Sequence, residues 1–445
     1  MRQFPNEPLI RFFDIGYTEA IMLNDVKTTR EALQSQCYKL VKPNFVRRVL
    51  GEINGTGVFF EEGESHKRQR RLLTGPFSYG SIKEMLPFFD EKAQELVGVL
   101  RTSIRRNGDE LVELSSLFSN VTLDIITLAC LGLRMHNMTE PSPFALAYAK
   151  VFENTPWSAI MHALNVYIPI RKLVPVKANR EFLQANQTVR NLLRQQIRNK
   201  RAALEGKEKA AITDKDLLAL MIKERGQGAE IWTEDEMLGH VTKLMLLSGH
   251  ETTAGTLTLT THTLANHKDI QDRLRKEITQ NFPSGASLDV ATIDKMPYLK
   301  NFSQEILRFY APGIVNWREV AEDIVLAGTR VPKGTIIHIA PAALHHNASI
   351  WGPTVDEFDP DRWDNISGDA KDPFAFGSFH NGPRICIGKS FALLEYKVIL
   401  IRLLQNFMFE DPEQKPLEFE RGAVSLRPKG GMHLRVQPIN NKGQE

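Results

Sequence analysis

The chain has 445 residues, of which 42% are hydrophobic and 24% are charged, the balance of an ordinary globular protein. Its formal net charge of +3, without a basic tail, excludes a nucleic-acid-binding protein, and its three cysteines are too few and too scattered for a disulfide framework. No stretch approaches the roughly 20 apolar residues that span a bilayer, and the N-terminus has no signal peptide. We therefore expect an intracellular protein without a transmembrane helix, whose contact with a membrane is peripheral.

Alternating polar and apolar residues predict strands near the start of the chain, in Leu9–Asp25. Over residues 78–309 the hydrophobic period is mainly helical, and further strand candidates follow at Asp323–Pro341 and Gly431–Pro438. The pattern contains no internal repeat and no long flexible linker. We therefore expect one domain, residues 1–445, that is mainly α with small β-sheets (α+β) contributed by both ends of the chain.

Two features of the first third of the chain have simple structural explanations. The cluster HKRQRR, at His66–Arg71, reads on its own as the solvated face of a helix. Cys37 and Cys130 have apolar neighbours in the sequence, so we expect them to be small core residues.

A long buried helix is predicted in the middle of the chain. Thr233 as N-cap and Glu236 three residues later form a capping box, and the helical pattern continues to about His267, roughly 50 Å at 1.5 Å per residue. Its apolar middle contains SGHETT, at Ser248–Thr253, although a glycine there costs about 1 kcal/mol and a buried acid needs a partner. The residues alone leave two explanations open: a packing notch in which Glu251 pairs with a base, or a functional groove.

The stretch FHNGPRICIGKS holds the third cysteine, Cys386, in an unusual setting. Gly382 can adopt a positive φ, and Pro383 stiffens the turn that follows. The helical pattern begins at Lys389, so the cysteine lies just before a helix N-terminus, where N–H groups and the helix dipole favour a thiolate. Gly388 leaves space beside the sulfur for a flat group.

Three chemical roles compete for this thiol. A catalytic nucleophile needs a base, for which the sequence gives no signature. A zinc site needs about four ligands, and this stretch offers only two candidate ligands, His380 and Cys386, without a paired C-x-x-C or H-x-x-x-H motif. An axial thiolate on haem iron needs a single protein ligand. A buried structural cysteine would leave the surrounding glycines, proline and Arg384 unexplained.

The spacing Phe379-x-x-Gly382-x-Arg384-x-Cys386-x-Gly388 resembles the haem-binding signature of the cytochrome P-450 family at all five fixed positions.

Two further motifs resemble the same family. Glu305-x-x-Arg308 resembles its glutamate–arginine pair, which the i, i+3 spacing places on one helix face. FDPDRW resembles the segment whose arginine, here Arg362, completes a buried salt-bridge triad with that pair. The resemblance extends from Leu9 to Val436 and implies the cytochrome P-450 fold, a triangular helical body with a long central helix. From the resemblance we expect the chain to lack the usual N-terminal anchor, hinge and first helix of microsomal relatives.

SGHETT resembles the oxygen-activating groove of the central helix, with Ser248 where the family usually has alanine or glycine. The resemblance implies that Thr252 places its hydroxyl near dioxygen, and the back-bond of this hydroxyl to the carbonyl of Ser248 would open the helix locally. Glu251, next to it, is the expected proton relay.

The resemblance also implies a haem b cofactor (iron protoporphyrin IX) with Cys386 as its axial iron ligand. Arg384 is expected to meet a propionate, and Phe379 and Gly388 belong to the same cofactor-binding loop. His66 and Arg70, four residues apart on a predicted helix, and Arg318 resemble further propionate-binding positions, and they complete the expected cofactor-binding residues.

The implied activity is that of a haem-thiolate monooxygenase, which inserts one oxygen atom from dioxygen into a lipophilic small molecule by hydroxylation or epoxidation. Electrons would come from NADPH through an NADPH–cytochrome P-450 reductase, for which Lys67, Arg68 and Arg71 offer either a basic docking face or only a solvated surface. Several motifs look most like fungal members, so we expect secondary-metabolite biosynthesis by a monomer associated with the cytosolic side of the endoplasmic reticulum.

Two other functions remain as hypotheses. A family member that rearranges or dehydrates an oxygenated substrate without dioxygen often lacks the acid–alcohol pair, and this chain keeps Glu251 and Thr252. A haem-binding protein without turnover is the second alternative, which a reductase-dependent product would exclude.

Overall fold

The computed structural model forms two compact units. Unit 1 comprises residues 1–68, 155–175 and 301–387, and unit 2 comprises 69–154, 176–300 and 388–445. The structure describes residues 4–14, 18–48, 57–108, 110–151, 160–161, 164–165, 174, 176–206, 215–223, 232–243, 249–283, 285–421 and 425–439.

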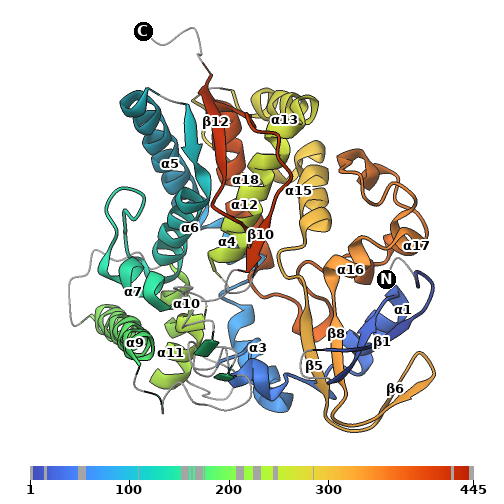
Figure 1. Ribbon diagram of the computed structural model, residues 1–445. Helices are drawn as coiled ribbons and strands as arrows, with labels where there is room; N and C mark the ends of the chain where they lie inside the picture. Colours follow the sequence, from blue (N-terminus) through green and yellow to red (C-terminus); the bar gives the residue numbers. More distant parts are fainter. Residues whose placement is uncertain are drawn as a thin grey trace. The chain divides into compact units, whose positions relative to one another are not determined.

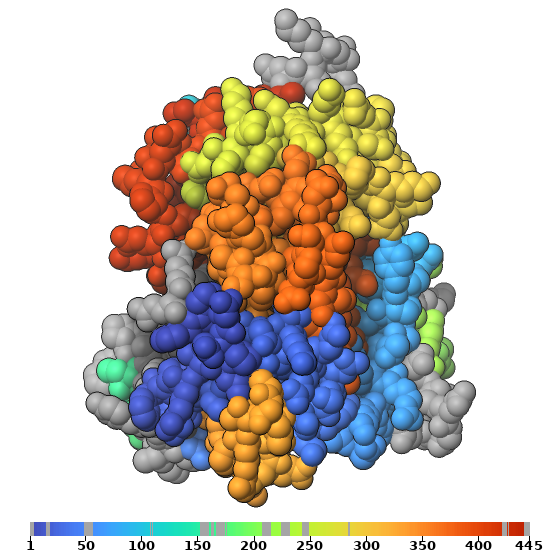
Figure 2. All heavy atoms as spheres, turned by 90° about the vertical axis from the view of Figure 1, so that its right-hand side faces the viewer, coloured from blue at the N-terminus to red at the C-terminus, as the bar shows by residue number. Residues whose placement is uncertain are grey.

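Unit 1 is built on a five-stranded sheet with the order β1-β2-β8-β5-β3. The N-terminal hairpin β1–β2 joins it through parallel pairing of β2 with β8, and Figure 2 shows these N-terminal residues (blue) lying against the orange segment of the same unit. A separate hairpin, β6–β7, follows β5. The strands are β1 (Leu9–Phe13), β2 (Glu19–Leu23), β3 (Leu40–Val41), β5 (Asn316–Val320), β6 (Ile324–Leu326), β7 (Thr329–Val331) and β8 (Ile336–Ile339).

Apolar residues of this sheet make the core of unit 1 with a short helical segment, Glu31–Ser35. Leu23, Ile337 and Ile339 are buried there together with Leu33 of that segment. The other helices of unit 1 are short: α1 (Val26–Arg30), α16 (Pro341–His345), α17 (Ala348–Trp351) and the 3-10 turns Pro360–Asp364, Gly368–Lys371, Pro373–Ala375 and Gly382–Arg384.

Unit 2 is mainly helical, and Figure 1 shows its long helices α5, α12 and α18. α18 packs on α5, and α12 packs on α6. The helices are α4 (Tyr79–Lys83), α5 (Leu86–Asn107), α6 (Leu114–Leu131), α7 (Pro143–Val151), α9 (Lys177–Leu204), α10 (Leu217–Lys223), α11 (Glu234–Lys243), α12 (Glu251–Asn266), α13 (Lys268–Asn281), α14 (Val290–Asp294) and α18 (Lys389–Asn406). Two helices, α3 (Gly63–Thr74) and α15 (Pro297–Tyr310), cross the boundary between the units.

Two small sheets complete unit 2. One has the order β4-β12-β9 and the other is the hairpin β10–β11. Their strands are β4 (Leu111–Glu113), β9 (Phe407–Glu410), β10 (Phe419–Arg421), β11 (Leu426–Pro428) and β12 (His433–Pro438). The protein is therefore mainly α with small β-sheets, and strands form within all three predicted segments.

The predicted central helix is correct at both ends and wrong in its continuity. The capping box forms as expected, since Thr233 Oγ1 accepts from the Glu236 N–H at 3.1 Å and the Glu236 carboxylate accepts from the Thr233 N–H at 3.0 Å. However, Gly249 and His250 form a bend, and α12 begins only at Glu251. His250 has φ −130° and ψ −45°, outside the helical region, and the neighbouring glycine lowers the cost of leaving it.

α6 corrects the expectation that no segment approaches a membrane span. By length and composition, it is the one described helix that could cross a bilayer. However, 72% of its residues are buried inside the protein. Its buried Asp124 accepts hydrogen bonds from both the backbone and the side chain of Asn137, as in a core helix with a satisfied polar group.

Candidate functional site

The cysteine loop of unit 1 is fixed by its backbone. Gly382 has φ +69°, and a Cβ at this position would overlap the carbonyl oxygen of Leu33, so only glycine fits. The Cys386 N–H donates to the carbonyl of Phe379 at 2.8 Å, and the Ile385 N–H donates to the carbonyl of Gly382 at 3.0 Å. The loop therefore holds an exposed Cys386 residue in a defined position.

Gly388 is the N-cap of α18, which begins at Lys389 as the sequence predicts. Cys386 therefore lies two residues before the cap along the chain. Cys37 and Cys130 are buried, as expected for core residues. Of the three cysteines, the one in the signature is thus the one that is presented at a surface.

Three basic side chains of unit 1, which we call the basic cluster, are Lys42, Arg318 and Arg384. Burial, and then the charges of Arg318 and Arg384, hold the pKa of Lys42 well below its usual value. Burial, and then the charge of Arg384, lowers the pKa of Arg318 to about 10. Burial, and then Arg318, also lowers the pKa of the neighbouring His380, which is therefore neutral.

Hydrogen bonds tie the basic cluster to its surroundings. Arg384 forms an ion pair with Glu62 and donates to the carbonyl of Glu61 at 3.0 Å. Arg318 donates to the carbonyl of Trp317 at 2.9 Å. Among the described residues, the Nε of Arg384 is buried without a hydrogen-bond acceptor, so the arginine keeps a donor that the protein does not use.

The cluster suits a bound dianion. Lys42, Arg318 and Arg384 lie together with the carboxylate of Glu62, whose charge acts on Lys42 and Arg318 and which pairs with Arg384. A buried excess of positive charge is costly unless an anion offsets it. The two propionates of haem supply such charge, so these residues fit the cofactor that the resemblance implies.

His66 and Arg70 both lie on α3, with the unit boundary between them. His66 belongs to unit 1 and is buried, with its Nδ1 3.3 Å from the Tyr38 hydroxyl. Arg70 belongs to unit 2 and is half-buried. The exposed Lys67 pairs with Glu64 at 2.7 Å on the same helix, so part of the HKRQRR charge is already engaged.

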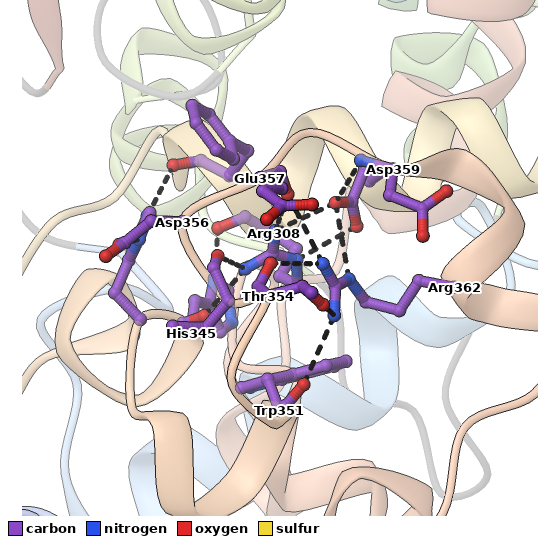
Figure 3. Close-up of polar contacts among 12 residues, drawn as sticks. Arg308, His345, Trp351, Thr354, Asp356, Glu357, Asp359 and Arg362 are labelled. Atoms are coloured by element: carbon purple, nitrogen blue, oxygen red, sulfur yellow. Dashed lines mark hydrogen bonds and ion pairs between the residues drawn. The ribbon is translucent and has the colours of Figure 1, made fainter.

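The predicted triad of unit 1 comes together around a fully buried carboxylate. Glu305 accepts from Arg308 through both oxygens, at 2.8 and 2.9 Å. The Nε of Arg362 lies 3.5 Å from Glu305 Oε1, an ion-pair distance. Figure 3 shows the guanidinium groups of Arg308 and Arg362 converging among backbone groups that include those of Trp351 and Thr354.

Two partners of the triad escaped sequence reasoning. The indole N–H of Trp363 donates to Glu305 at 3.0 Å. His345 lies 3.0 Å from the carbonyl of Arg308 through Nδ1, and its Nε2 accepts from the Gly377 N–H at 2.9 Å. Burial lowers the pKa of His345 to about 3, so the ring is neutral and joins the triad to the start of the cysteine loop. The tryptophan within FDPDRW was the available signal.

The acid of SGHETT is buried in unit 2 with a basic partner. Glu251 is 3% exposed, and its Oε1 accepts from Arg427 Nε at 3.2 Å and from the Ser425 hydroxyl at 3.3 Å. A second guanidinium nitrogen of Arg427 lies 3.1 Å from the same oxygen, an ion-pair distance. The packing explanation of SGHETT expected such a base. Thr252, half-buried, is the second residue of α12. Ser248 lies outside the described residues, and so does its expected bond with Thr252.

Comparison with known proteins gives a consistent result. The cytochrome P-450 family model matches residues 7–435. The cytochrome P-450 monooxygenase sphH of Aspergillus fumigatus is 31% identical over 98% of this chain and 82% of its own length. The cytochrome P-450 monooxygenase FUM15 of Gibberella moniliformis is 28% identical over 95% and 80%. Human cytochrome P-450 3A5 is 29% identical over 95% and 83%.

Proposed function

The chain belongs to the cytochrome P-450 monooxygenase family, and on that premise we propose that it inserts one oxygen atom from dioxygen into a lipophilic small molecule. The observation that carries the proposal is an exposed Cys386 on a rigid loop, in the same unit as a basic cluster that suits the haem propionates. The similarity to fungal monooxygenases supports hydroxylation or epoxidation in fungal secondary-metabolite biosynthesis.

Membership of the family implies haem, and residues of the chain would hold it. Cys386 would supply a thiolate ligand to the iron, and Arg318, Arg384 and Lys42 would bind the propionates, with His66 and Arg70 as the further expected partners. Phe379 and Gly388 would border the cofactor in the signature loop. When bound, the haem activates dioxygen, and its thiolate ligand favours O–O cleavage.

The protein's own task in this reaction is to orient the substrate and to deliver protons. Glu251 is buried next to the guanidinium of Arg427, a position from which its carboxyl group can relay a proton in a dry environment. Thr252, the next residue, offers a hydroxyl that can pass that proton on. We expect Thr252→Ala to raise the hydrogen peroxide released per NADPH consumed, with the surface variant Thr279→Ala as a control.

The remaining parts of the proposal concern partners and place. NADPH–cytochrome P-450 reductase would supply electrons, and Lys67, Arg68 and Arg71 would contribute to its docking face. We also propose that residues 1–445 act as one catalytic domain, because the family model spans both units. The protein would act as a monomer on the cytosolic side of the endoplasmic reticulum, in peripheral contact with the membrane.

Isotope labelling tests the proposed reaction. The purified protein, a cytochrome P-450 reductase and NADPH are incubated under ¹⁸O₂ with extracts of lipophilic fungal metabolites, and products are found by mass spectrometry. We expect a product that carries one ¹⁸O atom and requires both NADPH and the reductase. A product formed equally well without dioxygen would instead support the rearranging class and overturn the monooxygenase assignment.

A further inference from the structure

We propose that Arg427, assisted by Ser425, positions the buried acid Glu251 for proton delivery, which makes the β10–β11 hairpin part of the oxygen-activating apparatus. This inference rests on the proton-relay role proposed above for Glu251. Arg427 is therefore a positioning residue, acting on the reaction through the carboxylate that it holds.

The contact is close and joins a buried acid to a partly exposed arginine of the same unit. Two guanidinium nitrogens and one hydroxyl converge on a single oxygen, Glu251 Oε1, at 3.1, 3.2 and 3.3 Å. The carboxylate side chain is 3% exposed, whereas that of Arg427 is 45% exposed. Charge-assisted hydrogen bonds of this kind fix direction as well as distance, so the arginine determines where the acid points.

Among the described residues, three titratable groups near the start of α12 are neutral: Tyr148, whose pKa the charge of Glu251 affects, His250, which precedes Glu251 in the chain, and Glu395, which lies close to Thr253. Burial raises the pKa of the Tyr148 hydroxyl on α7, and the charge of Glu251 raises it further. Burial lowers the pKa of His250 to about 3 and raises the pKa of Glu395 on α18 well above its usual value. Arg427 thus supplies positive charge to a buried carboxylate beside these uncharged groups.

The hairpin fixes the arginine in turn. Arg427 lies in β11, where its backbone is in register with Glu420 of β10. A displacement of this two-stranded sheet therefore moves the guanidinium of Arg427 and, through the ion pair, the carboxylate of Glu251 at the start of α12. Residues 176 positions apart in the sequence are joined in this way, and the pairing is not part of the signature motifs.

Dioxygen reduction without an organic substrate tests the inference, since the probe is dioxygen itself. The haem-loaded protein is supplied with NADPH and a cytochrome P-450 reductase, and NADPH consumption is compared in H₂O and D₂O. Glu251→Gln is the reference for loss of the acid, and Arg427→Gln removes the positioning charge. Arg427→Lys keeps a charge, and Arg435→Gln removes a half-exposed arginine that pairs with the exposed Glu410 at 3.4 Å.

We expect Glu251→Gln to slow NADPH consumption by about 10²-fold and Arg427→Gln to slow it by about tenfold or more, both with an enlarged solvent isotope effect. Arg427→Lys should recover much of the loss, and Arg435→Gln should match the wild type. Amide hydrogen exchange is a measure that does not depend on turnover. Because Glu251→Gln removes the ion pair with Arg427, amide exchange in Phe419–Pro428 should become faster in this variant.

The outcomes separate the two proposals. If Glu251→Gln is slow while Arg427→Gln keeps the wild-type rate and isotope effect, the positioning role is wrong and the proton relay stands. If Glu251→Gln itself matches the wild type, the proton-relay role fails and the inference fails with it. Equal losses in Arg427→Lys and Arg427→Gln, together with equally lowered thermal stability, would reduce Arg427 to a structural residue.

Discussion

At the scale of single residues, buried positive charge gives unit 1 its chemical character. Lys42 and Arg318 are 7% and 6% exposed, and burial lowers the pKa of each. The charge of Arg384 lowers both pKa values further, and the charge of Arg318 also lowers that of Lys42. Such a group destabilises the protein by itself and becomes favourable when an anion binds. The cost of burying these cations is therefore an argument for a site that takes up carboxylates.

Lys42→Met should have opposite effects on the haem-free and haem-loaded protein. Because the pKa of Lys42 is lowered in the folded state, the unfolded chain binds more protons between that value and 10.5. The free energy of unfolding of the haem-free protein therefore rises with pH across this window, by up to about 1.4 kcal/mol per pH unit for one proton. Lys42→Met should remove that slope, as measured by urea unfolding at a series of pH values.

The loaded protein should lose haem faster in the same variant, because a proposed propionate partner is gone. The rate is measured by monitoring, through absorbance, the transfer of haem to an excess of a protein that binds haem with high affinity. Lys39→Met, at an exposed lysine close by in the chain, is the control and should keep both the slope and the rate. If the free energy of unfolding of Lys42→Met depends on pH as steeply as that of the wild type, the titration of Lys42 is not the cause of the slope.

At the scale of elements, the cysteine loop depends on a close approach to the Glu31–Ser35 segment. Gly382 lies against the backbone of Leu33 in a conformation with φ +69°. The family signature predicts this glycine, and its positive φ was expected from the residue type. The neighbour that excludes a side chain was not predictable, because it comes from a segment about 350 residues earlier in the sequence.

Gly382→Ala should distort the loop and reduce haem incorporation. Gly328 is a matched control, since its φ of +74° carries the same backbone cost but its Cβ position meets open space. We expect Gly328→Ala to cost about 1 kcal/mol, with normal haem content, and Gly382→Ala to cost several times more. Haem content per chain and thermal unfolding distinguish them, and equal behaviour of the two variants would disprove the close-approach argument.

The triad ties α15 to the segment that contains Arg362. Glu305→Gln should destabilise the protein by about 3–5 kcal/mol, because it leaves Arg308 buried without its countercharge. Glu410→Gln removes an exposed ion pair with Arg435 and should change stability by less than about 0.5 kcal/mol. Urea unfolding of both variants measures the difference, which would vanish if the buried pair contributed no more than the exposed one.

At the scale of the whole molecule, the sequence predicts what local rules control. The capping box of Thr233 and Glu236 and the helix after Cys386 follow from spacing within a few residues. The partners of buried charges do not, as Arg427 lies 176 positions from Glu251. The break at Gly249 does not follow from the helical pattern, because an apolar helical period continues through it; only the glycine and the local opening expected between Ser248 and Thr252 from the resemblance pointed to it.

We propose that Cys386 is the thiolate ligand of the haem iron. The most direct test of this assignment is the absorption spectrum of the dithionite-reduced protein with carbon monoxide. We predict the red-shifted Soret band of thiolate ligation for the wild type and for Cys130→Ala, which alters a buried core cysteine, and its loss in Cys386→Ala. A histidine-type spectrum in the wild type, or an unchanged thiolate band in Cys386→Ala, would contradict this assignment.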